Sequence, residues 1–116
     1  MPRFVVLEHR FRGVHWDFML EWGGALRTWA LDEPPQADRP IPADRLADHR
    51  LLYLDYEGPI RGDRGSVTRW DWGTYDLLDE TPSSVRACLQ GGRCQGEVAL
   101  EQDSQTGRWR FRHVRP

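Results

Sequence analysis

Residues 14–31 read VHWDFMLEW-GG-ALRTWAL, two runs rich in aromatic and aliphatic residues that are joined by a pair of glycines. Glycine readily adopts the positive φ angles of a two-residue hairpin turn, so the sequence predicts two antiparallel strands with Gly23 and Gly24 between them. Side chains alternate between the two faces of a strand. One face of the first strand carries the residues that we expect in the core: Trp16, Phe18, Leu20 and Trp22.

The opposite face of the same strand carries His15, Asp17, Met19 and Glu21. His15 and Asp17 are two residues apart, which places their Cα atoms about 6–7 Å from each other on one face, close enough to chelate one ion. His9 precedes them by six residues. Two imidazoles and one carboxylate are sufficient to hold a divalent metal and to leave positions open for water and substrate. The alternative is a solvated strand face, because so short an H-x-D pattern also arises by chance.

The rest of the chain also consists mainly of short apolar runs between turn residues. These predict strands over residues 3–9, 67–72 and 73–78 and a second hairpin over residues 96–102 and 107–114, with an irregular loop over residues 32–43. Thr81 followed by Pro82, with Gly91 as a stop, favours one short helix over residues 81–92. The predicted fold is mainly β, a small β-barrel of short antiparallel strands with one short helix, in a single domain over residues 1–116.

Composition supports a globular protein. The chain has 116 residues, 39% of them hydrophobic and six of them Trp, and no apolar run long enough to cross a bilayer. We therefore expect a cytoplasmic protein without a membrane partner, in which Cys88 and Cys94 are ordinary thiols. The net charge of −2 indicates that any nucleic-acid partner must be held locally. All 16 basic residues are Arg, the side chain that grips phosphate bidentately.

A second group of polar residues lies in DHRLLYLDYEG, residues 48–58. If this segment folds against the first hairpin, the imidazole of His49 and the phenol of Tyr53 can bind a phosphate oxygen or donate a proton near a metal. The alternative is that Tyr53 and Tyr56 are core aromatics and that His49 lies on the surface.

Several motifs occur in an order that matches a known family. EHRFRGVHWDFMLEW at residues 8–22 and GGALRTWAL at residues 23–31 are followed by DHRLLYLDYEG, by VTRWDWGTY at residues 67–75 and by GRWRFRHV at residues 107–114. Together they resemble the 3′-phosphoesterase domain of bacterial DNA ligase D over nearly the whole chain. Members of this family remove a terminal ribonucleotide from a DNA 3′ end to leave a 3′-phosphate, and then hydrolyse that phosphate.

The resemblance implies a role for each candidate residue. His9, His15 and Asp17 would coordinate a divalent metal, manganese in that family, with zinc or cobalt as alternatives. His49 and Tyr53 would engage the scissile phosphate or the water beside the metal. The implied fold is a small β-barrel with the site on its open face, and the implied partners are nucleic-acid 3′ ends, such as a primer-template, and separate ligase or polymerase proteins. We expect a monomer.

The chain departs from the family pattern where phosphate would be gripped. Leu7 stands where the family usually has glutamine, Met19 where it has arginine, and Glu33 near a position that often carries lysine. A thioether cannot replace a guanidinium as a phosphate ligand. We take Arg12, Arg27 and Arg45 as the candidate substrate-binding residues, with Arg10 and Arg39 as further arginines near the two histidine segments.

Three classes of function follow. The first is a metal-dependent phosphoesterase that processes nucleic-acid 3′ ends in DNA repair, and the second is a catalytically impaired metal-binding module that recognises such ends or a repair partner. The third is a non-haem iron oxygenase, because two histidines and a carboxylate also form that metal site. The position of the extra histidine, upstream of the H-x-D pair, disfavours the oxygenase.

Overall fold

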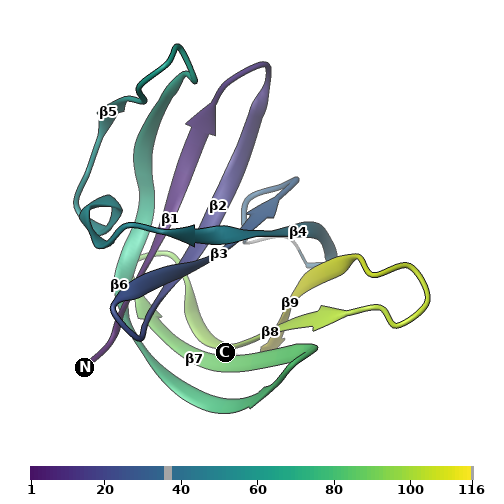
Figure 1. The fold of residues 1–116 in the computed structure, drawn as a ribbon. Helices are drawn as coiled ribbons and strands as arrows, with labels where there is room; N and C mark the ends of the chain where they lie inside the picture. The colour runs from purple at the N-terminus through teal and green to yellow at the C-terminus, as the bar shows by residue number, and fades with distance from the viewer. Residues whose placement is uncertain (36–37, 116) are drawn as a thin grey trace.

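The computed structural model describes residues 1–35 and 38–115, and within them it is almost entirely β-sheet (Figure 1). A single 3₁₀ helix, η1 (Leu51–Leu54), lies between two strands of this part of the chain. None of its helical segments has the length and hydrophobicity needed to cross a bilayer. The strands are β1 (Arg3–Arg10), β2 (Val14–Trp22), β3 (Ala25–Leu31), β4 (Ile41–His49), β5 (Gly58–Pro59), β6 (Ser66–Thr81), β7 (Ser84–Gly91), β8 (Gln95–Gln102) and β9 (Trp109–Arg115).

The strands form one closed antiparallel sheet. Their order is β1-β2-β3-β4-β9-β8-β7-β6-β5, and β1 also pairs with β6, so that all strands except β5 close into a ring. Figure 1 shows β6 running the height of the molecule and then curving around its lower edge beside β7. The predicted mainly β barrel is therefore confirmed.

The predicted hairpin of β2 and β3 is also confirmed. Trp22 pairs with Ala25, and the two glycines between them have φ angles of 63° and 85°. Residues with a Cβ atom rarely adopt such angles. Phe18 and Leu20 are fully buried inside the ring, where they join the interior cluster. The largest side chains of this cluster are Phe4, Phe18, Trp29, Tyr75, Trp109 and Phe111.

A second, smaller cluster lies on the outer face of β1, β2, β3 and β6. It consists of Val5, Leu7, Met19, Leu26, Leu54 and Val67, with Tyr53, Tyr56 and Ile60 packed against it. The segment from η1 to the β5–β6 turn covers this face, and Met19 and Asp17 are only 1% and 3% exposed. The first two strands are thus buried on both faces, and the face that carries His15 and Asp17 is not simply solvated.

The helix predicted over residues 81–92 is wrong. Thr81 pairs with Ser84 across a tight turn, and residues 84–91 form β7. Val85, Ala87 and Leu89 are buried and alternate with more exposed residues, which is the period of a strand. Pro82 lies in the turn between β6 and β7. The pattern fitted both structures, because proline has the same fixed φ at the start of a turn as at the start of a helix.

Two further boundaries differ from the prediction. Residues 66–81 form one continuous strand rather than two, because Gly73 lies so close to β7 that a Cβ there would be 2.1 Å from Gln90 O. The glycine permits pairing instead of breaking the strand. The loop predicted over residues 32–43 ends early, since β4 already begins at Ile41, and residues 36 and 37 lie outside the described part of the chain.

A buried carboxylate holds the turn between β7 and β8. Asp71 of β6 is 3% exposed, and its two oxygens accept hydrogen bonds from Gly92 N (2.9 Å) and Cys94 N (2.7 Å). A Cβ on Gly91 would lie 2.5 Å from Asp71 Oδ2, so the turn backbone approaches this carboxylate closely. One side chain thereby satisfies two backbone amides that would otherwise lack partners.

We expect Asp71→Ala to lower the free energy of unfolding by about 2–4 kcal/mol, because two backbone amides lose a charged acceptor. Urea unfolding followed by circular dichroism measures this change. Asp79→Ala is the control, since Asp79 is an exposed carboxylate on the same strand, and its effect should stay within about 0.5 kcal/mol. Equal effects of the two substitutions would contradict the assigned role of Asp71.

Candidate metal centre

The register of β1 and β2 brings the three predicted ligands together. His9 near the end of β1 pairs directly with His15 near the start of β2, and Leu7 pairs with Asp17. Residues that face each other in an antiparallel ladder share one face of the sheet, as do residues two apart on one strand. All three side chains therefore project from the outer face at one end of the hairpin, and we call them the candidate metal centre.

The nitrogen and oxygen atoms of this centre are close enough to share one ion. His9 Nδ1 lies 3.1 Å from His15 Nε2 and 3.6 Å from Asp17 Oδ2. His15 Nε2 lies 3.0 Å from Asp17 Oδ1. All the donor atoms lie within 4.8 Å of one another, as expected for atoms that surround a cation at a bonding distance of about 2.0–2.2 Å.

Asp17 fits a metal ligand better than it fits an ordinary core residue. Its Oδ1 atom is buried and accepts no well-directed hydrogen bond among the described residues, although His15 Nε2 is near. A buried carboxylate oxygen without a partner is costly. A cation in contact with Asp17 would remove that cost.

The ring of His9 is also oriented as metal binding requires. His9 Nε2 lies 2.8 Å from the backbone carbonyl oxygen of Arg64, so Nε2–H donates to that oxygen. Nδ1 then carries the lone pair that faces His15 and Asp17. A carbonyl that accepts the distal N–H of a histidine in this way fixes the tautomer and the ring orientation that metal binding requires.

The second predicted group lies beside this centre. His49 at the end of β4 donates from Nδ1 to Ala47 O (2.9 Å), and its ring meets that of Tyr53 in η1 edge-on at 5.9 Å. Both side chains are half-buried. They line one cavity of about 120 Å³ together with His9 and Asp17. The structure thus joins the two groups that the sequence placed in separate segments.

We call this space the site cavity. Its remaining lining is mostly apolar and includes Leu7, Met19, Ile60 and Val67, and its one cationic residue among those described is Arg64. Leu7 and Met19 are at most 1% exposed and belong to the outer-face cluster. Polar and charged groups therefore meet an apolar floor, where electrostatic interactions are stronger than in water.

The arginines chosen from the sequence make other contacts. Arg12 lies over the ring of Phe11 at 5.1 Å. Arg27 lies over the Trp22 ring at 3.6 Å and pairs with Glu80. Arg45 lies over the Trp29 ring at 4.7 Å and donates to Thr28 O. Arg12, Arg27 and Arg45 are not among the described residues that line the site cavity.

Sequence reasoning missed Arg64. Its contact with His9 spans 55 residues of the chain, and the RGDRG segment reads only as a glycine-rich turn. A pattern confined to neighbouring residues cannot reveal such a contact.

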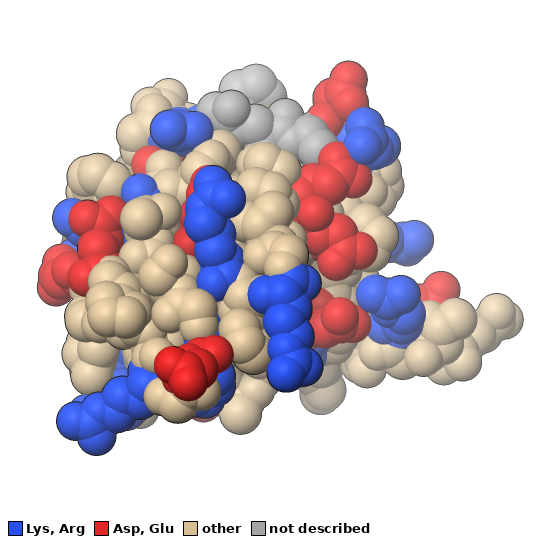
Figure 2. Space-filling view, turned by 90° about the horizontal axis from the view of Figure 1, so that it is seen from above, with Lys and Arg blue, Asp and Glu red and all other residues tan. Residues whose placement is uncertain are grey.

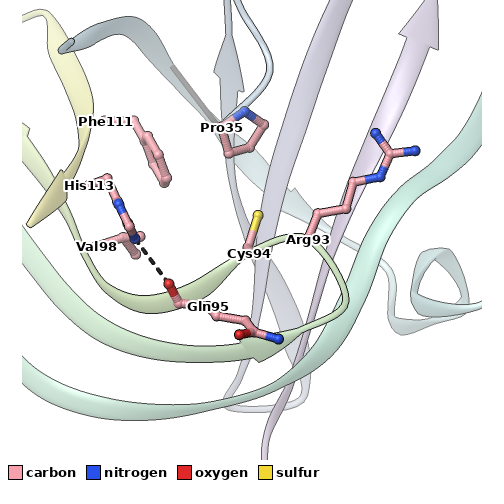
Figure 3. Close-up of a pocket in the computed structure, with 7 residues that line it drawn as sticks. All are labelled: Pro35, Arg93, Cys94, Gln95, Val98, Phe111 and His113. Carbon is pink, nitrogen blue, oxygen red and sulfur yellow. Dashed lines mark hydrogen bonds between the residues drawn. The ribbon is translucent and has the colours of Figure 1, made fainter. Parts of the chain in front are cut away.

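A different cavity of about 340 Å³ offers less chemistry (Figure 3). His113 Nε2 bonds to Gln95 O there, and Cys94 projects between Pro35 and Arg93. Burial raises the pKa of the Cys94 thiol far above its usual range, with a further contribution from Asp71. A thiol that stays protonated is a poor nucleophile, so the candidate metal centre remains the better reactive site.

Among the described residues, surface charge does not form one broad basic tract near the centre. In Figure 1 the connection from β1 to β2 and the turn from β5 to β6 lie at the top, and Figure 2 views the molecule from above. Basic and acidic side chains are mixed on that face. An anionic ligand must therefore be held by local contacts, in keeping with the net charge of −2.

We expect the affinity for Mn²⁺ to fall as the pH is lowered. The contact with Asp17 raises the pKa of His15 while burial lowers it, and the net shift is upward. Protonated histidine cannot bind a metal, so protons compete at a higher pH than for an ordinary histidine, with about a tenfold loss of affinity per pH unit below that pKa. Calorimetric titrations from about pH 8 to about pH 6 measure the effect.

His113→Ala is the matched control, because His113 lies on β9 and outside the site cavity. It should leave both the affinity and its pH dependence unchanged, whereas His15→Ala should abolish tight binding. An affinity that does not change with pH would contradict the assignment of His15 as a ligand.

Comparison with known proteins confirms the resemblance drawn from the motifs. The family model of the DNA ligase D 3′-phosphoesterase domain matches residues 7–112. The multifunctional non-homologous end joining DNA repair protein LigD of Mycobacterium tuberculosis (strain ATCC 25618 / H37Rv) is 38% identical over 106 residues, which cover 84% of this chain and 14% of the relative.

The multifunctional non-homologous end joining protein LigD of Pseudomonas aeruginosa PAO1 is 34% identical over 112 residues, which cover 92% of this chain and 13% of the relative. The chain thus spans only 13–14% of the length of these relatives. The matched residues 7–112 include both groups that meet at the site cavity. The chain therefore belongs to the DNA ligase D 3′-phosphoesterase domain family.

Proposed function

We propose that this chain is a metal-dependent phosphoesterase that processes nucleic-acid 3′ ends in DNA repair, removing 3′-terminal ribonucleotides and 3′-phosphates. One observation carries the proposal: His9 and Asp17 of the candidate metal centre line the same small cavity as His49 and Tyr53, with His15 in contact with both ligands. Membership of the ligase D 3′-phosphoesterase family supports the same class of substrate. Phosphoryl transfer depends mainly on positioning and electrostatic stabilisation, and these two groups supply both.

His9, His15 and Asp17 would hold the divalent cation. Imidazole and carboxylate ligands suit manganese, and they also suit zinc or cobalt. When bound, such a cation polarises a phosphoryl oxygen and lowers the pKa of a neighbouring water. The carbonyl of Arg64 keeps His9 Nδ1 directed toward the other two ligands.

His49 and Tyr53 would act on the phosphate from the other side of the cavity. Because His49 Nδ1 is bonded to Ala47 O, Nε2 is the ring nitrogen left to exchange a proton with the reacting groups. The hydroxyl of Tyr53 can donate a hydrogen bond to a non-bridging oxygen as negative charge grows there. The edge-on contacts of Tyr53 with His49 and Tyr56 hold the phenol in place.

One observation favours a second function, the recognition of nucleic-acid ends without hydrolysis. The floor of the site cavity is apolar at Leu7 and Met19, and the cavity measures only about 120 Å³. A thioether gives little stabilisation to the dianion of a terminal phosphate. A metal-bound end could then be retained without being cleaved.

Incubation of the protein with Mn²⁺ and a primer-template that ends in a 3′-ribonucleotide tests the proposal. We expect release of the terminal nucleoside and then of phosphate. His15→Ala should lower the rate by about 100-fold or more, because one of three ligands is lost. His49→Ala should lower it by about 10²–10⁴-fold, the usual contribution of acid–base catalysis.

His113→Ala is again the control and should retain full activity. Binding of the DNA end without turnover, with any of several metals, would favour the second function. Absence of both binding and turnover, or turnover that His15→Ala leaves intact, would overturn the proposal.

A further inference from the structure

Arg64 is the only Lys or Arg among the described residues that line the site cavity. It lies in the turn between β5 and β6, and its backbone oxygen contacts His9 at the edge of this cavity. The other lining residues offer two carbonyl-anchored imidazoles, one carboxylate, one phenol and an apolar floor. For a phosphate bound in this cavity, Arg64 would be the lining residue with a permanent positive charge.

The backbone that carries Arg64 is held firmly against β1. Ile60 N–H donates to Gly65 O at 2.8 Å, which closes the turn. Gly65 has a φ of +80°, and a Cβ there would lie 1.8 Å from Arg10 O, so only glycine allows this approach. The turn therefore docks directly on the end of the strand that carries His9.

The side chain of Arg64 is anchored at one point and keeps other donors. Nε donates to Arg61 O at 2.9 Å. Among the described residues Arg64 forms no ion pair with a carboxylate. In contrast, Arg10, Arg27 and Arg45 each pair with a carboxylate. The two terminal nitrogens of Arg64 thus remain for an anion, and a guanidinium can grip a phosphate with two parallel hydrogen bonds.

We propose that Arg64 binds the substrate phosphate, with its terminal N–H groups donating to non-bridging oxygens while the candidate metal centre engages the same phosphate from the side of His9. This inference rests on the proposed function and names the residue that supplies the phosphate affinity that Met19 cannot supply. The same residue orients His9 through its backbone carbonyl. One turn therefore positions a metal ligand and the cation that receives the anion.

The two roles of Arg64 can be separated, because substitution removes the guanidinium and keeps the carbonyl. We expect Arg64→Ala to weaken the binding of inorganic phosphate to the Mn²⁺-loaded protein by about 10–100-fold, because hydrogen bonds between charged groups contribute a free energy of this size. The affinity for Mn²⁺ itself should stay unchanged. Arg64→Lys, which keeps the charge but not the bidentate geometry, should give an intermediate phosphate affinity. Isothermal titration calorimetry measures both ligands.

Arg61→Ala is the matched control, since Arg61 lies on the same turn and does not line the site cavity. It should leave phosphate affinity nearly unchanged, and thermal unfolding verifies that each variant is folded. In the primer-template assay Arg64→Ala should raise KM more than it lowers kcat. An equal loss of Mn²⁺ and phosphate affinity, or no loss of either, would overturn the role of Arg64.

The outcomes also distinguish this inference from the proposed function. Turnover that Arg64→Ala leaves intact would refute the inference alone. Phosphate binding that depends on Arg64 in a protein with no hydrolytic activity would support the anion contact and refute the proposed hydrolysis. A protein that neither binds phosphate nor hydrolyses the substrate would refute both.

Discussion

The register of β1 against β2 is the constraint on which the rest of the structure depends. It places His9 opposite His15 and Asp17 opposite Leu7. A slip by one residue would turn every side chain of β2 to the other face, moving Phe18 and Leu20 out of the interior cluster and turning His15 and Asp17 into the ring. The register is secure because both faces of these strands are buried, one in the interior cluster and one in the outer-face cluster.

The outer-face cluster explains why a reactive site forms at this place. Its apolar surface needs a cover, and the segment that provides it runs from η1 to the β5–β6 turn. That segment carries Tyr53 and Arg64, and it begins two residues after His49. The burial that stabilises the outer face therefore also assembles the site cavity. The same arrangement makes the floor of the cavity apolar, so few charged groups are present to bind an anion.

Local patterns correctly predicted those elements whose sequence pattern fits only one type of secondary structure. Alternation and the Gly-Gly turn predicted the β2–β3 hairpin, and alternation also predicted the pairing of β8 with β9. The predicted helix failed because Thr81 and Pro82 suit both a helix start and a tight turn between strands. The burial of Val85, Ala87 and Leu89 in the closed sheet favours the strand over the helix. No local window contains that information.

By itself the sequence determined the mainly β fold, the family and the face shared by His15 and Asp17, since strand alternation and ordered motifs are properties of neighbouring residues. Only the tertiary structure decided which of the 16 arginines reaches the site and that His49 and Tyr53 meet the candidate metal centre. These contacts join segments far apart in the chain, and they form because covering the outer-face cluster brings those segments together.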